Sequence, residues 1–336
     1  MFNFAIIGCG VIAPSHVQAI KEAGNSAKLY AVCDIIEDKA IKFKETHGAE
    51  KVYIDYKDML ADSNVDVVCI CTPSGMHGEM TINAARAGKH ILCEKPIEIT
   101  AKKMKAVIDV VEKSGVNMAC VFQRRTQPIA VKVKEAIDNG EFGKVLVADA
   151  YMKSWRSKEY YKSADWRATW ELDGGGALMN QGIHGIDLIS WFCGGIDSVK
   201  SIVRTRYHDI AVEDAAVVAV EYKNGAIGVI QGTTCVYPGQ DVRFEIHCEK
   251  GSIIFTDNGI LLWGDKGYEA SGEGSGVKDN PAALGSLSHT PILLDLIDAI
   301  KNNRPPMVTP AEGRKAVDTI LAIYQSSKTG KAVKLK

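Results

Sequence analysis

The chain has 336 residues, which is long for one domain and sufficient for two domains that each bury a core. Its 40 basic residues (lysine and arginine) nearly balance its 41 acidic residues, so the net charge is -1. This balance argues against nucleic acid or an anionic membrane as a partner. No apolar run reaches the ~18 residues of a membrane span, and the N-terminus enters a strand without a basic leader. We expect neither membrane insertion nor secretion.

The nine cysteines are odd in number, and no CxxC pair occurs among them. This pattern disfavours zinc binding or redox chemistry and favours buried, reduced thiols in a cytoplasmic protein. Most of them fall within apolar strands, namely Cys9, Cys33, Cys69, Cys71, Cys93 and Cys120.

A short apolar run, 2–7, predicts a buried strand, and a GxGxxA pattern follows it at 8–13. Gly8 permits the tight turn, Gly10 lets the backbone approach a pyrophosphate, and Ala13 lets the next helix pack on the sheet. That helix would direct its free N–H groups and its positive end at the phosphates. The alternative is a structural turn without a ligand. The residues of this loop that we expect at a dinucleotide are Gly8, Gly10, Val11 and Ile12.

A second strand, 29–33, ends in Asp34, where a ribose-binding carboxylate is expected. A carboxylate binds a free ribose hydroxyl pair and repels a 2′-phosphate, and no arginine follows to offset that repulsion. NAD is therefore favoured over NADP. Lys39 and Lys42 keep the NADP alternative open.

Strands and helices alternate over the first 120 residues, which predicts a doubly wound parallel sheet. After residue 122 the pattern changes to alternating stretches joined by tight turns, including the hairpin signal Asn224-Gly225. We expect an α/β chain with a Rossmann domain at 1–122 and, at 123–336, an α/β domain with an open, mostly antiparallel sheet. A Gly- and Ser-rich loop is expected at 264–285, before two closing helices at 287–302 and 310–328.

Ligands bind doubly wound sheets at the carboxyl ends of the strands. The loop after the fourth strand holds Thr72, Pro73 and His77, and we expect it to line the cofactor as well as start a helix. His77 lies in the first helical turn, where a positive charge is unfavourable, so a neutral ring is expected.

Glu94-Lys95-Pro96 follows the next strand. The Lys95 ammonium at this place can polarise a substrate oxygen, while Glu94 can steady that charge or bind a ribose. The alternative is a solvent-facing ion pair.

The third candidate stretch starts at Gly174-Gly175-Gly176 and predicts a helix to residue 192. A regular helix would place Asn180, His184 and Asp187 on one face. This polar face is either the solvent-exposed side of an amphipathic helix or part of a ligand-binding site. The glycines and the histidine favour a binding site. Metal ligation by His184 and Asp187 stays open, although no further ligand is in view.

At these stretches the chain resembles the Gfo/Idh/MocA family of sugar and cyclitol oxidoreductases. The resemblance rests on Gly8-Cys9-Gly10, Cys71-Thr72-Pro73, Glu94-Lys95-Pro96, the 174–184 stretch, and the ending that includes Glu312-Gly313 and Tyr324-Gln325-Ser326. It implies that Lys95 bonds the reacting hydroxyl and that His184 moves its proton. Many members carry an aspartate four residues before the histidine, where this chain has Asn180, so a proton relay through that position is in doubt and Asn180 is expected only to position a sugar hydroxyl.

The same resemblance places Trp166 and Arg167 near the cofactor or substrate and Gln123 over the nicotinamide. Arg124 can bind a phosphate or carboxylate of the substrate, or, like Arg125, can be a surface charge.

We therefore expect an NAD-dependent dehydrogenase that oxidises a secondary hydroxyl of a sugar, a sugar derivative such as a nucleotide sugar, or a cyclitol. A variant that keeps its cofactor through turnover stays open. The alternative is a dinucleotide-binding sensor of the same fold without turnover. A homodimer or homotetramer is implied by the resemblance alone.

Overall fold

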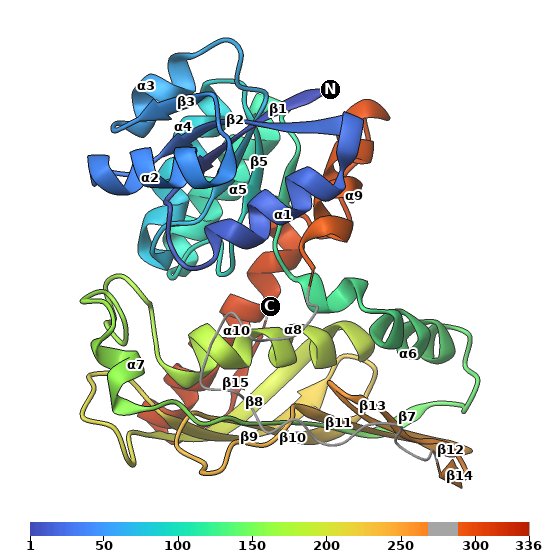
Figure 1. Ribbon diagram of the computed structural model, residues 1–336. Coiled ribbons are helices and arrows are strands. Elements are labelled where there is room, and N and C mark those ends of the chain that lie inside the picture. The colour runs from blue at the N-terminus through green and yellow to red at the C-terminus, as the bar shows by residue number, and fades with distance from the viewer. Residues whose placement is uncertain (268–287, 336) are drawn as a thin grey trace. The chain divides into compact units, whose positions relative to one another are not determined.

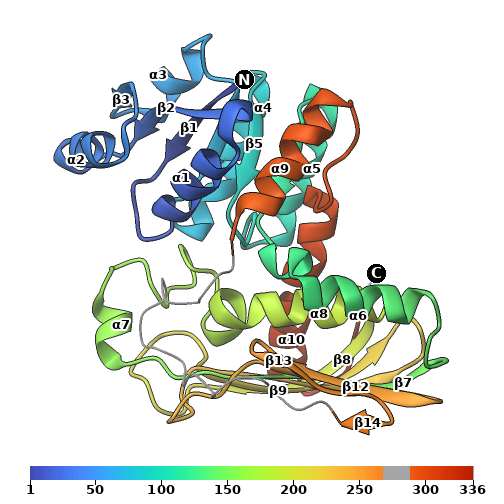
Figure 2. The same ribbon diagram turned by 45° about the vertical axis from the view of Figure 1, so that its right-hand side comes forward.

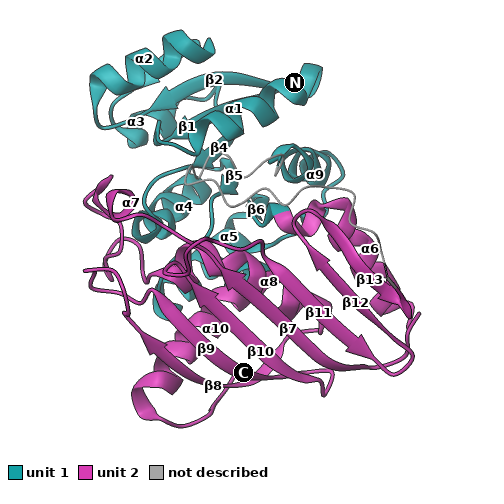
Figure 3. Ribbon diagram, turned by 60° about the horizontal axis from the view of Figure 1, so that its bottom comes forward, with its two compact units in different colours: residues 1–123, 285–314 teal, residues 124–284, 315–336 magenta. Residues whose placement is uncertain are grey.

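The computed structural model describes residues 1–267 and 288–335. The chain divides into two compact units, shown in two colours in Figure 3. Unit 1 contains residues 1–123 and 285–314, and unit 2 contains residues 124–284 and 315–336. This division differs from the one expected from the sequence, because a late segment of the chain packs with the N-terminal unit.

Unit 1 is built on a six-stranded parallel sheet in the order β3-β2-β1-β4-β5-β6. The strands are almost wholly apolar because helices lie on both faces of the sheet. The strand order reverses between β1 and β4, which is where such sheets bind dinucleotides. The doubly wound fold is confirmed. The strands are β1 (Phe2–Ile7), β2 (Ala27–Cys33), β3 (Lys51–Tyr53), β4 (Val67–Ile70), β5 (His90–Cys93) and β6 (Met118–Cys120).

The late segment that joins unit 1 contributes helix α9, which lies beside α1 in Figures 1 and 2. One face of α9 supplies four buried aliphatic residues to the core that α1 covers. Their burial explains why the segment packs here. The helices of unit 1 are α1 (Ala13–Glu22), α2 (Glu37–His47), α3 (Tyr56–Ala61), α4 (His77–Arg86), α5 (Ala101–Ser114) and α9 (Thr290–Lys301).

Unit 2 holds a nine-stranded sheet in the order β14-β13-β12-β11-β7-β10-β9-β8-β15. All of its neighbouring strands are antiparallel except β7 and β10, so the expected mostly antiparallel sheet is confirmed. The Asn224-Gly225 turn joins β9 to β10, and Gly225 has the positive φ of +88° that this turn needs. The strands are β7 (Val145–Lys153), β8 (Ile196–Arg204), β9 (Ala215–Tyr222), β10 (Ile227–Thr233), β11 (Arg243–Cys248), β12 (Gly251–Thr256), β13 (Gly259–Gly264), β14 (Lys266–Gly267) and β15 (Val333–Lys334).

Helices lie on one face of this sheet, as Figure 1 shows for α8 and α10. Side chains on β9 alternate between buried and exposed, as a sheet with one covered face requires. The helices of unit 2 are α6 (Pro128–Asp138), α7 (Lys158–Lys162), α8 (Ile183–Phe192) and most of α10 (Pro310–Thr329), whose first residues belong to unit 1.

Two expectations need comment. The helix predicted to run from Gly176 to Phe192 begins instead with a π-helical turn, Leu178–Gly182, that precedes α8. The loop predicted at 264–285 lies largely outside the described residues. Across the described ranges, no helix combines the length and apolar character needed to cross a bilayer.

Candidate functional site

The two glycines of the loop after β1 differ in the space around them. Gly8 has a φ of +92°, and a Cβ added there would lie 2.8 Å from the carbonyl oxygen of Cys71. Gly10 would accept a Cβ with no heavy atom within 4 Å. A side chain at Gly8 would therefore strain the fold, whereas the space at Gly10 is available to a ligand at the start of α1. This arrangement fits a pyrophosphate bound at a helix N-terminus.

Asp34 is held in place at the carboxyl end of β2. Its Oδ2 accepts a hydrogen bond of 3.0 Å from the Cys9 backbone N–H, and its Oδ1 accepts one of 3.1 Å from Ile36. Lys39 Nζ lies 2.9 Å from Oδ2. Burial tends to raise the pKa of this carboxyl, but these hydrogen bonds outweigh burial and lower it. An ionised carboxylate beside the glycine loop suits an adenosine ribose.

His77 connects the loops that follow β4 and β5. Its Nδ1 lies 2.6 Å from the carbonyl oxygen of Pro96, and its Nε2 lies 2.7 Å from that of Thr72. The ring is buried, and burial lowers its pKa. In these contacts His77 fixes the two loops rather than presenting a polar atom to solvent. From the sequence we also expect Thr72 or Ser74 to cap the helix that follows, and this expectation is wrong, because no side-chain hydrogen bond caps the start of α4.

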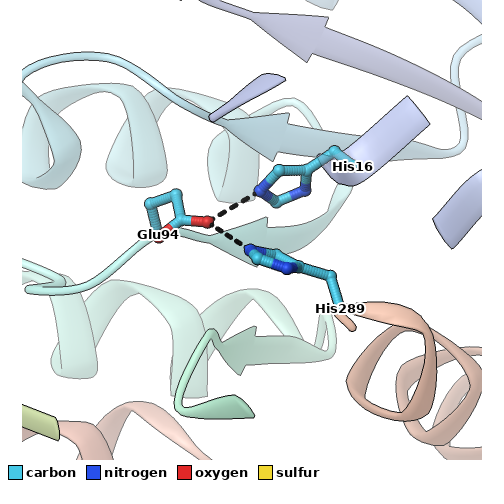
Figure 4. Close-up of side chains that lie close together, drawn as sticks. All are labelled: His16, Glu94 and His289. Atoms are coloured by element: carbon cyan, nitrogen blue, oxygen red, sulfur yellow. Dashed lines mark hydrogen bonds and ion pairs between the residues drawn. The ribbon is translucent and has the colours of Figure 1, made fainter. Parts of the chain in front are cut away.

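Glu94 lies between two histidines that the sequence analysis did not single out (Figure 4). Its Oε1 is 2.9 Å from Nε2 of His16 on α1 and 2.9 Å from Nε2 of His289, the residue that precedes α9. All three side chains are buried. His289 gave no local signal, because its place beside Glu94 depends on the packing of α9 against α1.

Glu213 shapes the start of the glycine-rich stretch in unit 2. Its carboxylate accepts hydrogen bonds of 2.9 Å from the backbone N–H groups of Gly176 and Leu178. The hydroxyl of Tyr324 donates a third bond, also of 2.9 Å. A Cβ on Gly176 would lie only 1.8 Å from the carbonyl oxygen of Glu213. Gly176 is therefore needed for the close approach of the Glu213 backbone.

The π-helical turn changes the expected stripe of Asn180, His184 and Asp187. Asn180 lies within the π turn, where the residue spacing differs from that of a regular helix, whereas His184 and Asp187 both lie in α8. Asp187 is buried, and both of its oxygens accept hydrogen bonds from Arg125. The alternative of a metal held by His184 and Asp187 is thus unsupported, because the aspartate neutralises an arginine. Arg125 is likewise not a surface charge.

Arg167 belongs to a polar and aromatic cluster close to the π turn. Its NH1 donates a hydrogen bond of 2.9 Å to the hydroxyl of Tyr160, which also accepts one of 3.0 Å from Gln181. The guanidinium carbon lies 4.5 Å from the ring centre of Tyr160 and 4.7 Å from that of Trp166. Gln181 is next to Asn180, whose side-chain amide donates to Asp173 at 3.3 Å. The cluster connects Trp166 and Arg167 to the stretch that carries His184.

Arg124 is not a surface charge either. It is buried and forms an ion pair with Asp257, in which NH2 of the arginine donates a hydrogen bond of 3.2 Å to Oδ2 of the aspartate. Whether it binds substrate stays a prediction, as do the cofactor roles of Val11, Ile12 and Gln123. Gln123 is buried and ends the first segment of unit 1, whereas the Val11 side chain is exposed.

Comparisons with known proteins agree with this geometry. Residues 2–122 match the oxidoreductase family with an NAD-binding Rossmann fold, and residues 130–254 match the GFO/IDH/MocA C-terminal domain. A myo-inositol 2-dehydrogenase from Thermotoga maritima is 29% identical over 99% of this chain and 98% of its own. An inositol 2-dehydrogenase from Rhizobium meliloti is 30% identical over 75% of this chain and 74% of its own.

A solved structure extends the likeness to the whole fold. The WlbA dehydrogenase from Bordetella pertussis, in complex with NADH and UDP-GlcNAcA, is 30% identical with a TM-score of 0.88. The alignment covers 100% of this chain and 99% of that one. The expectations of the fold, of an NAD cofactor and of an oxidoreductase are confirmed.

Proposed function

Because the chain belongs to the Gfo/Idh/MocA family of NAD-dependent oxidoreductases, we propose that it oxidises one secondary hydroxyl of a sugar, a sugar derivative or a cyclitol. The observation that carries the proposal is the pairing of the open Gly10 with the ionised Asp34, which together suit the pyrophosphate and ribose of NAD. Bound NAD⁺ supplies a hydride acceptor at C4 of the nicotinamide. The alcohol loses a hydride and a proton and becomes a ketone.

Lys95 and His184 have the catalytic roles in this proposal. Lys95 follows the carboxyl end of β5, where the Lys95 ammonium can hydrogen-bond the reacting hydroxyl and stabilise the developing alkoxide. His184 lies in the first turn of α8 and accepts the proton, which suits an imidazole near neutral pH. Asn180 cannot carry a proton and positions a substrate hydroxyl by hydrogen bonding.

A nucleotide sugar is the second substrate candidate within this class. The guanidinium of Arg167 lies near two aromatic rings, those of Tyr160 and Trp166, and Tyr160 also binds Gln181. A guanidinium and aromatic faces together suit a phosphate group and a base. The similarity to a dehydrogenase crystallised with UDP-GlcNAcA favours the same class.

The test is a panel of inositols, glucosides and UDP-linked sugars assayed with NAD⁺ by the absorbance of NADH. We expect turnover with at least one class, and Lys95→Ala should lower kcat by about 10²- to 10⁴-fold with little change in NAD⁺ affinity. Normal turnover in Lys95→Ala contradicts the assigned role. Cofactor binding without turnover on any member of the panel favours the sensor alternative.

The protein also forms a homodimer or homotetramer in this proposal, through the open face of the unit 2 sheet. That face presents Ile202, Val217 and Ile227, which are 64%, 50% and 58% exposed. Ile202 and Val217 are paired across β8 and β9, so two of these apolar side chains are neighbours. Exposed apolar groups on one sheet face suit a second copy of the chain.

All nine cysteines are free, and seven of them are buried. Free thiols persist in a reducing compartment. This supports the proposal that the protein works in the cytoplasm.

A further inference from the structure

The cluster of His16, Glu94 and His289 has no role in the proposed mechanism, although its parts come from three separate segments of unit 1. Glu94 directly follows β5, His16 lies on the helix after the glycine loop, and His289 precedes α9. Figure 4 shows both rings directed at one carboxylate oxygen. A buried charge is costly unless it is paired or hydrogen-bonded, so this arrangement invites a functional explanation.

The hydrogen bonds define the protonation of the cluster. Both Nε2 atoms lie 2.9 Å from the same oxygen, so each ring places a proton on Nε2. Both Nδ1 atoms are buried and have no hydrogen-bond partner in the described part of the chain. A neutral ring leaves only a lone pair there, whereas a protonated ring leaves a buried N–H group without an acceptor, which costs more. The ring centres are also only 4.9 Å apart, where two positive rings repel each other.

Two neutral donors thus surround an ionised carboxylate. Burial alone tends to raise the pKa of Glu94, but the hydrogen bonds from the two histidines hold that pKa well below its usual value. The cluster therefore carries one fixed negative charge near neutral pH.

The three ligand-type atoms lie within 4.8 Å of one another, so a divalent metal such as Zn²⁺ is an alternative occupant. Metal binding at Nε2 moves the remaining proton of each ring to Nδ1. Metal-bound histidines normally donate that N–H to an acceptor, and within residues 1–267 and 288–335 neither ring has one. The hydrogen-bonded cluster is favoured over the metal site.

The strand order indicates which half of the dinucleotide experiences this charge. Asp34, at the end of β2, marks the adenosine half, and the glycine loop after β1 marks the pyrophosphate. The nicotinamide half then lies over the carboxyl ends of β4, β5 and β6, and Glu94 is the first residue after β5. NAD⁺ carries a positive charge on its nicotinamide ring, and NADH carries none.

We propose that the negative charge of Glu94 makes unit 1 bind NAD⁺ in preference to NADH, and that His16 and His289 are positioning residues that hold this charge in place. The proposal deepens the proposed function, because it favours the oxidation of an alcohol over the reduction of a ketone. It concerns cofactor binding alone and can be tested without a substrate.

The test compares the dissociation constants of NAD⁺ and NADH, measured by calorimetry without substrate. Glu94→Gln keeps the shape of the side chain and an oxygen for both histidines but removes the charge. We expect about tenfold weaker NAD⁺ binding and a change of less than about twofold for NADH. The matched control is Asp34→Asn, which removes a carboxylate at the adenosine end. It should weaken both cofactors equally, because that end is identical in the two redox forms.

The positioning role is tested by a conservative rescue. His289→Gln keeps an N–H donor close to the position of Nε2, and His289→Leu removes it. We expect the glutamine variant to keep the wild-type preference for NAD⁺ and the leucine variant to lose most of it. This pair also decides the question if Glu94→Gln fails to fold.

Three results overturn the proposal. The first is an unchanged preference for NAD⁺ in Glu94→Gln. The second is an equal loss of that preference in His289→Gln and His289→Leu. The third is stoichiometric Zn²⁺ binding by the wild type that His16→Gln abolishes. A shifted preference without turnover of any alcohol leaves this inference standing while the proposed function fails.

Discussion

Arg125 donates two hydrogen bonds to the carboxylate of Asp187, from Nε to Oδ2 at 2.8 Å and from NH2 to Oδ1 at 2.6 Å. Both side chains are buried in unit 2, with 4% and 1% of their surfaces exposed. The pair connects the segment before α6 to the middle of α8. Because the two oxygens of Asp187 are used in this way, the helix that carries His184 is anchored through its aspartate.

The first prediction concerns this pair. Asp187→Asn keeps the volume of the side chain but removes the carboxylate charge that faces the buried Arg125 guanidinium. We expect the free energy of unfolding to fall by about 3 kcal/mol or more, as for other broken buried pairs. Urea denaturation followed by circular dichroism measures the change. The control is Asp109→Asn, which breaks an exposed pair with Lys105 and should lower the free energy of unfolding far less. Equal losses of unfolding free energy in the two variants would show that the burial of an ion pair does not determine its contribution to stability.

The second prediction separates the two glycines of the phosphate loop. Gly8→Ala forces a Cβ against the Cys71 carbonyl at a φ of +92°, so we expect it to lower the melting temperature. Gly10→Ala adds a methyl group to open space, so we expect unchanged stability but at least about tenfold weaker NAD⁺ binding. Thermal melts and calorimetric titrations of both variants provide the comparison. Unimpaired NAD⁺ binding by Gly10→Ala would show that the pyrophosphate does not bind at this loop.

Features of the fold and site that depend on local sequence were predictable, and those that depend on distant partners were not. The glycine loop, Asp34 and the alternating strands follow from residue type and spacing within short windows. The glycine stretch before the π turn is held by Glu213, whose carboxylate also binds Tyr324, and these residues meet only in the folded chain. Similarly, the inward direction of Asp187 depends on Arg125, 62 residues away in sequence.

The packing of α9 in unit 1 could not be predicted from the sequence for the same reason. Its apolar face, with Ile292, Leu293, Leu296 and Ile297, would suit the core of either unit. No local pattern distinguishes the two cores. His289 was missed together with α9, because the histidine reaches Glu94 only when this helix packs on α1.

The third prediction concerns acid stability and His16. Burial lowers the pKa of this ring below its usual 6.5, although the hydrogen bond to Glu94 opposes the shift. The unfolded chain therefore binds a proton that the folded chain resists, and this part of the stability is lost as the pH falls below about 6.5. The lowered pKa of Glu94 adds a loss only below about 4.5. We expect the free energy of unfolding to decrease less between pH 7.5 and 5.5 in His16→Gln than in the wild type.

Denaturation curves at both pH values measure that difference. The control is His247→Gln on β11, which makes the same substitution at a half-exposed ring. Parallel behaviour of the wild type and His16→Gln would mean that the buried ring does not resist protonation.

The last prediction concerns the open face of the unit 2 sheet. Val217 is half exposed, and its neighbours in the same row are Ile202 on β8 and Gln231 on β10. A carboxylate placed in this row costs little in a monomer, because it stays in water, but it is desolvated when a second copy covers the face. We therefore expect Val217→Glu to weaken self-association strongly while leaving the melting temperature of the dissociated chain within a few degrees. Sedimentation velocity over a range of protein concentrations measures the assembly. Ile41→Glu introduces the same charge on an exposed side chain of α2 and should leave the assembly intact. A wild type that sediments as a monomer at every concentration, or an unchanged assembly in Val217→Glu, would exclude this face as the interface.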